Sequence, residues 1–123
     1  MLKLLLAIFL LSVSVHQIKS FAFENYSNVG IASWYGEEFQ GKVTASGSLF
    51  DMRELTAAHK FLPFGTLVRV VNLRNNQEVI VSIIDRGPFS RKRIIDLSHA
   101  AAKSIGLVKR GLARVKIEVL SQP

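Results

Sequence analysis

Apolar and polar residues alternate along several stretches of the chain, which is the two-residue period of a strand with one buried face. The clearest stretch is 112–120, where Ala113, Val115, Ile117 and Val119 are predicted to face inward and the charged residues between them to face water. Three other stretches are predicted as strands from their apolar and β-branched content. They are 29–35, 66–73 and 78–85. The polar tetrapeptide between the last two predicts a hairpin connection.

One segment near the C-terminus follows the helical period instead. A short helix is predicted to begin at Asp96 or Ser98, with Asp96 assigned to the capping role, and to end at Gly106. Its apolar stripe consists of Leu97, Ala101 and Ile105. Many short strands, glycine turns and one helix together predict a mainly β protein, a small closed or nearly closed β-barrel.

The first 22 residues have the layout of a secretory signal peptide. A positive start at 1–3 precedes an apolar run at 4–15, and small residues at 20 and 22 offer a cleavage site. The apolar run is shorter than the roughly 20 residues of a membrane span, so a retained anchor or a core helix is the weaker alternative. We therefore expect a signal peptide at 1–22 and a single domain at 23–123. The expected product is exported, periplasmic or secreted, and has no stable membrane anchor.

Composition narrows the chemistry that this domain can perform. The 123 residues include no cysteine and only three scattered histidines, so we expect no disulfide, no metal site and no cofactor. The formal net charge is +7 for the whole chain and +5 without residues 1–22, where 14 basic and 9 acidic residues remain. This charge suits anionic partners such as cell-wall polymers or membrane surfaces, although it could serve solubility alone. Nucleic acid is not expected as a partner, because the export signal argues against it and no nucleic-acid-binding motif is evident. We expect a monomer.

The most informative acid is Asp85, which ends the predicted strand 78–85 directly before a turn at Gly87 and Pro88. By the two-residue period it shares a face with the apolar residues of that strand, so it would be partly withdrawn from water, as a general acid requires. The alternative is structural, because an aspartate before a turn often accepts backbone N–H groups. His59 also has two interpretations. It could orient a carboxylate or shuttle a proton, or it could be a structural histidine.

Aromatic residues cluster near glycines and turns. We expect most of them in the core, because a small domain needs their large buried area, and we expect any exposed ones to stack on sugar rings. They are Trp34, Tyr35, Phe39, Phe50, Phe61, Phe64 and Phe89.

Six short motifs in order along the chain resemble the rare lipoprotein A family, over about residues 29–120. They lie at 30–36, 44–47, 55–59, 62–66, 85–89 and 94–98. The resemblance implies a six-stranded double-psi β-barrel with one or two short helices. It also implies an endolytic peptidoglycan lytic transglycosylase, which cleaves glycan strands, preferably without stem peptides, to leave 1,6-anhydromuramyl ends.

The resemblance also assigns roles to individual residues. Asp85 matches the family's catalytic aspartate, expected to act as acid and then base, and His59 matches the histidine expected to orient it. The residues expected to form the substrate groove are Trp34, Tyr35, Arg86 and Ser48. Ser48 stands where the family usually has a glutamate and cannot supply its negative charge, so we expect a slower enzyme. The alternatives are a non-catalytic, expansin-like glycan-binding or wall-loosening module, and a structural partner of a wall-synthesis complex.

Overall fold

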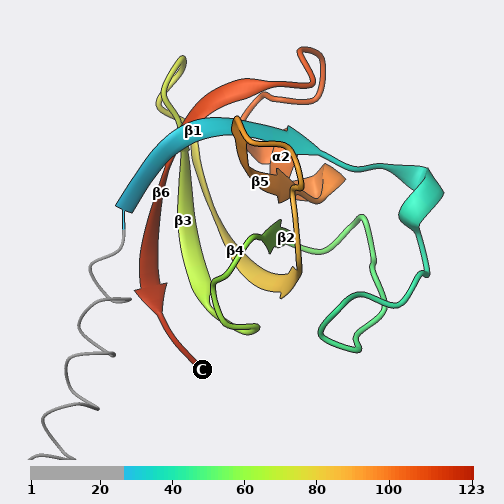
Figure 1. Ribbon diagram of the computed structural model, residues 1–123. Helices are drawn as coiled ribbons and strands as arrows, with labels where there is room; N and C mark the ends of the chain where they lie inside the picture. The colour runs from blue at the N-terminus through green and yellow to red at the C-terminus, as the bar shows by residue number, and fades with distance from the viewer. Residues whose placement is uncertain (1–26) are drawn as a thin grey trace, which may run out of the picture.

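The computed structural model describes residues 27–123, so the expected signal peptide at 1–22 and the domain boundary at 23 lie outside the described residues. Six strands wrap into one closed barrel (Figure 1). In chain order the elements are β1 (Ser27–Trp34), the 3-10 helix η1 (Glu37–Phe39), β2 (Thr56–His59), β3 (Leu67–Asn72), β4 (Glu78–Asp85), β5 (Arg93–Leu97), α2 (His99–Ser104) and β6 (Ala113–Ser121).

Around the ring the strand order is β1-β5-β2-β4-β3-β6. The pairs β1/β5 and β2/β4 are parallel, whereas the other neighbours, including the predicted hairpin of β3 and β4, are antiparallel. The prediction of a mainly β, closed six-stranded barrel is confirmed.

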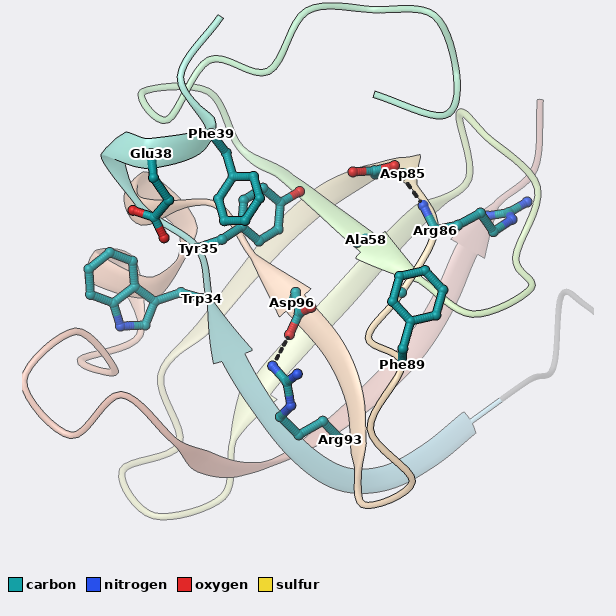
Figure 2. Close-up of a pocket in the computed structure, with 11 residues that line it drawn as sticks. Trp34, Tyr35, Glu38, Phe39, Ala58, Asp85, Arg86, Phe89, Arg93 and Asp96 are labelled. Carbon is teal, nitrogen blue, oxygen red and sulfur yellow. Dashed lines mark hydrogen bonds and ion pairs between the residues drawn. The ribbon is translucent and has the colours of Figure 1, made fainter. Parts of the chain in front are cut away.

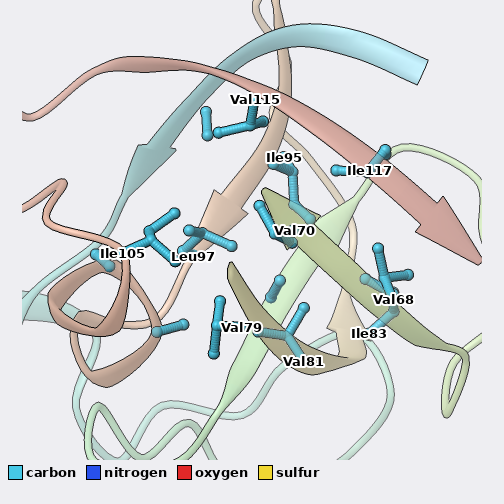
Figure 3. Close-up of a cluster of buried hydrophobic side chains, with 14 of the residues drawn as sticks. Val68, Val70, Val79, Val81, Ile83, Ile95, Leu97, Ile105, Val115 and Ile117 are labelled. Carbon is cyan, nitrogen blue, oxygen red and sulfur yellow. The ribbon is translucent and has the colours of Figure 1, made fainter. Parts of the chain in front are cut away.

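The barrel interior is filled by β-branched and leucine side chains that alternate along the strands (Figure 3). In β3 and β4 every second residue is buried, and in β6 the predicted inward positions Val115, Ile117 and Val119 are buried. Removing these side chains from water is the main stabilising contribution in a chain without disulfides.

The helix begins at His99, two residues later than the predicted cap Asp96 would place it and directly after the alternative cap Ser98. Ser98 is the N-cap, and its hydroxyl accepts the Ala101 N–H at 3.3 Å. Asp96 lies inside β5, a strand that the local sequence pattern did not reveal, so its assignment to capping is wrong. The reason is that β5 pairs with β1 and β2, whose sequences are distant, and five residues carry too little periodicity to stand out.

The expectation that most aromatic residues are core is also wrong. Of the seven, Phe50 is fully buried, whereas Phe39, Phe61 and Phe89 are 42%, 52% and 93% exposed. A small six-stranded barrel is already filled by valine, isoleucine and leucine, so Trp34 and Phe64 pack against the core only in part and three of the other rings are exposed outside it.

Two smaller observations complete the fold. Val43 forms an isolated antiparallel bridge to Leu49, outside the six strands of the barrel. Within residues 27–123, no helix is both long and apolar enough to cross a membrane.

Candidate active site

Four residues on adjacent strands form one lateral row across the barrel wall, which we call the pocket row: Ser33, Asp96, Ala58 and Asp85. Ser33 of β1 pairs with Asp96 of β5, and Ala58 of β2 pairs with both Asp96 and Asp85. Paired residues on neighbouring strands point to the same face. Two carboxylates therefore stand on either side of one small alanine side chain.

A register shift places Asp85 in this row. Ala57 pairs with Ile83, but the next residue, Ala58, pairs with Asp85, so Ile84 is an extra residue in β4. A bulge of this kind re-aims the side chain that follows it. The period-two prediction that Asp85 shares the face of the core residues before it is wrong for this reason. Asp85 instead faces the side opposite Ile83.

The pocket row borders an open pocket of about 370 Å³ (Figure 2). Of the predicted site residues, Asp85, Trp34, Tyr35 and Arg86 line it, whereas His59 and Ser48 do not. The sequence analysis did not assign the other lining residues to a site: Glu38, Phe39, Ala58, Gly87, Phe89, Arg93 and Asp96. The spacing of Asp96 within a strand could have identified it, had that strand been recognised.

Asp85 uses only one of its two oxygens in the fold. Its Oδ1 accepts the backbone N–H groups of Ala45 and Arg86, each at 2.9 Å. The structural interpretation of this aspartate is therefore correct as far as Oδ1 is concerned. Within residues 27–123 no hydrogen-bond donor reaches Oδ2, so that oxygen can carry or receive a proton.

Asp96 is held more tightly than Asp85. Its Oδ1 accepts a hydrogen bond from the Ser33 hydroxyl and one from Arg93 Nη1 at 2.9 Å, and Arg93 Nη1 also donates to the Ser33 hydroxyl. Figure 2 shows this pair on the pocket side of β5. Each of the two carboxylates therefore keeps Oδ2 without a hydrogen-bond partner in residues 27–123, and they differ in that Asp96 is paired with an arginine whereas Asp85 accepts only backbone N–H groups.

Tyr35 places a phenol beside both carboxylates. Burial, and then the negative charges of Asp85 and Asp96, raise the pKa of Tyr35 far above its usual value, so it stays a neutral O–H donor. Its ring packs against Phe50 and Phe39, with ring centroids 4.6 and 5.4 Å apart. The hydroxyl oxygen is buried and has no hydrogen-bond partner in the described part of the chain. Such a group is costly unless a ligand pairs with it.

His59 lies on the core side of β2, since it pairs with the buried Ile95 and is 1% exposed. Its Nδ1 accepts the backbone N–H groups of Phe61 and Leu62 at 3.2 and 3.1 Å. Burial, and then the positive charges of Arg86 and Lys60, lower the pKa of His59 to about 4. The imidazole is therefore neutral near pH 7 and shapes the turn after β2.

Arg86 also binds the turn after β2, through backbone carbonyl groups. Its Nη1 donates to the carbonyl oxygens of Leu62 and His59 at 2.9 and 3.3 Å. The guanidinium lies 4.0 Å from the Phe64 ring centroid. These contacts fix its positive charge at the edge of the pocket.

Ser48 lies on an exposed loop that contacts the end of β4. Its hydroxyl forms a triangle of hydrogen bonds with the Thr44 and Ser46 hydroxyls, at 3.1 and 2.9 Å. The loop is joined to β4 by the Ser46 N–H, which donates to the Ile84 carbonyl at 3.2 Å, and by the Ala45 contact to Asp85. Ser48 is thus near the pocket rim but turned toward its own loop.

No metal site accompanies these groups in the described residues, since His, Asp and Glu side chains nowhere gather in threes there. What the arrangement offers is two carboxylates, a neutral phenol and aromatic walls around one open pocket.

Comparison with known families and proteins gives a consistent result. The family profile described as lytic transglycolase matches residues 27–117. The endolytic peptidoglycan transglycosylase RlpA of Haemophilus influenzae is 55% identical over 97 residues, which cover 79% of this chain and 34% of that protein. RlpA of Pseudomonas aeruginosa is 55% identical over 93 residues, covering 76% of this chain and 27% of that protein. The chain thus spans about a third or less of the length of these two relatives.

Solved structures with low sequence identity share the fold. A Streptomyces papain inhibitor superposes with a TM-score of 0.64 at 21% identity, covering 78% of this chain and 96% of the inhibitor. An expansin from Clavibacter michiganensis superposes with a TM-score of 0.63 at 19% identity, covering 80% and 52%. At these identities the likeness concerns the barrel alone.

Proposed function

The chain belongs to the lytic transglycolase family and carries its double-psi β-barrel, and from that premise we propose that it is an endolytic peptidoglycan lytic transglycosylase. The observation that carries the proposal is the pocket row, which presents Asp85 and Asp96 to an open pocket on a domain 55% identical to two such enzymes. The products would be glycan strands that end in 1,6-anhydromuramic acid.

In the proposed reaction Asp85 acts twice. Its protonated Oδ2 donates to the glycosidic oxygen as the bond from that oxygen to muramic acid C1 breaks, and the released strand keeps the proton. The carboxylate then accepts the proton of the C6 hydroxyl, whose oxygen attacks C1 of the same sugar. Water is not consumed, and Asp85 ends protonated as it began. The two backbone N–H groups on Oδ1 support this assignment, because they leave Oδ2 for the proton.

Asp96 and Tyr35 are assigned supporting roles. Between the two steps C1 carries partial positive charge, which a fixed carboxylate stabilises when it is already in place. Asp96, oriented by Arg93 and Ser33, is suited to that task. The neutral Tyr35 side chain would form part of the groove wall beside the two acids. Trp34 and Arg86 would form the groove walls.

His59 is assigned a positioning role, not contact with substrate. It follows Ala58 in β2 and organises the turn that Arg86 also binds, so it helps to fix the strand between the two acids. Ser48 remains a weak polar substitute for the family glutamate, and we expect a correspondingly slower enzyme.

A substrate of this kind lies outside the cytoplasm, which supports an extracytoplasmic site of action. We propose that residues 1–22 direct export and that 23–123 act as one monomeric domain, without a cofactor or nucleic acid. The second candidate function is an expansin-like module that binds glycan without cleaving it, which Ser48 favours.

The test is to incubate the full chain with glycan strands that lack stem peptides and to measure 1,6-anhydromuramyl ends by mass spectrometry. Asp85→Asn keeps an oxygen for the two backbone N–H groups but cannot transfer the proton, and we expect it to lose activity about 100-fold or more. Asp51→Asn is the matched control, an acid-to-amide change outside the pocket, and should retain activity.

The outcomes separate the two candidates. Binding without anhydro ends would favour the expansin-like module. Activity that survives Asp85→Asn would show that another group transfers the proton.

A further inference from the structure

A second and larger cavity, of about 630 Å³, adjoins the Asp85 pocket. It is lined by the loop that follows β4 and by Lys60 at the end of β2. Arg86, Gly87 and Phe89 line both cavities, so the two cavities are adjacent at these residues. Figure 2 shows Arg86 and Phe89 on the same side of the Asp85 pocket. A polymer seated over Asp85 would extend into the second cavity.

The charged residues of this second cavity all have the same sign. Lys60, Arg86 and Arg91 line it, and no acidic residue does. None of the three forms a salt bridge with an acid of residues 27–123. An uncompensated positive cavity attracts an anion.

Two of the three cations, Lys60 and Arg86, are also held in place. Lys60 Nζ donates to the Ser90 carbonyl at 2.9 Å, which uses one of its three donors and leaves two for a ligand. Arg86 uses Nη1 for the turn after β2, which leaves its Nε and Nη2 donors for other partners. Preorganised donors of this kind bind an anion with less loss of side-chain entropy.

Phe89 stands where the two cavities meet, with 93% of its surface exposed. A phenyl ring so exposed contributes almost nothing to the core. Its flat apolar face matches the C–H face of a pyranose ring. An aromatic surface beside a row of cations suits a sugar that carries a negative charge.

We propose that the second cavity binds the free lactyl carboxylate of a muramic acid residue in the strand that occupies the Asp85 pocket, with Phe89 packed against the sugar. The inference rests on the proposed function and names the residues, Lys60 and Arg91, that would determine its specificity for strands without stem peptides. Where a stem peptide is attached, the carboxylate is a neutral amide that bears a bulky chain. Arg91 and Lys60 would then lose their anionic partner, so the groove selects strands without peptides.

The test compares two forms of one substrate. Fluorescently end-labelled strands with free carboxylates are measured beside the same strands coupled to methylamine, which removes the charge without adding a peptide. Binding is measured by anisotropy with the full chain carrying Asp85→Asn, so that cleavage does not interfere. The variant Lys60→Gln with Arg91→Gln should weaken binding of the carboxylate form about tenfold, or about 1.4 kcal/mol, and leave the amide form unchanged.

The matched control is Lys109→Gln with Arg110→Gln, an equal loss of charge on an exposed loop outside both cavities, and it should change binding less than about twofold. The inference is overturned if the control pair weakens binding equally, or if Lys60 and Arg91 do not distinguish the two forms. Failure of the proposed function would look different, because the unsubstituted chain would then produce no anhydro ends from either form.

Discussion

At the scale of single residues, the position of Asp85 depends on its neighbour Ile84. The extra residue shifts the register between β2 and β4 by one, and a shift of one residue turns a side chain to the opposite face. Without it Asp85 would follow Ile83 toward the core, where an unpaired carboxylate is costly. The bulge therefore places the acid in the pocket row.

Ser48 allows a direct test of the missing family glutamate. Ser48→Glu adds a carboxylate on the loop joined to the end of β4, and we expect the rate of anhydro product formation to rise several-fold through stabilisation of positive charge at C1. The expected loss of two weak hydroxyl contacts affects only an exposed loop. Ser46→Glu, two residues earlier on the same loop, controls for added charge. An unchanged rate for Ser48→Glu would mean that the existing carboxylates suffice.

Burial of His59 should make the free energy of unfolding depend on pH. Its pKa falls from 6.5 to about 4 on folding, mainly through burial. Between these values the unfolded chain binds a proton that the folded chain does not, so stability is lost as the pH falls through that window. From about pH 7.5 to about pH 5 the loss should approach 2 kcal/mol, measured by urea unfolding.

His59→Asn is the comparison for this effect. An asparagine oxygen can replace Nδ1 as acceptor for the Phe61 and Leu62 N–H groups, but it does not titrate. The variant should be less stable at every pH, because it leaves a cavity, yet show a flatter dependence. Equal slopes would show that His59 is not the titrating group.

At the scale of elements, the six-residue helix α2 is too short to be stable by itself and depends on its junction with the barrel. The Ser98 hydroxyl accepts the Ala101 N–H and also donates to the Glu54 carbonyl at 2.6 Å. One side chain thus caps the helix and connects it to the segment before β2. β2 is the strand that carries Ala58 of the pocket row.

Removing that hydroxyl should have a measurable cost. Ser98→Ala is expected to lower the free energy of unfolding by about 1–2 kcal/mol, because a buried cap and a carbonyl both lose their partner. Ser104→Ala, at the exposed end of the same helix, should cost less than about 0.5 kcal/mol. Both are measured by urea unfolding, and similar losses for the two variants would contradict the cap.

Elements differed in how far local sequence could predict them. The strand at 78–85 coincides with β4, because its valines and isoleucines repeat every second residue between clear turns. β5 was missed, because its five residues derive their strand conformation from β1 and β2 on either side. The same error hid Asp96 from the candidate site.

At the scale of the whole molecule, a closed small β-barrel follows from the strand pattern, and six motifs were enough to predict the family. The pocket, in contrast, could not be predicted from the strand pattern. Its two carboxylates are neighbours only through β2, and one of them depends on a register shift that no local pattern encodes. The sequence thus identified Asp85 as a candidate, but it did not predict which face of β4 the Asp85 side chain occupies or that Asp96 lies beside it in the pocket row.

The position of β6 bears on the order of synthesis. β6 lies between β1 and β3, so the ring is completed by the last strand of the domain to leave the ribosome. Until then the earlier strands can form at most an open sheet with two unpaired edges, and such edges readily pair with other chains. Arrival of Ala113–Ser121 covers both edges at once. The interval of exposure therefore ends in one event, after the other five strands of the barrel have been made.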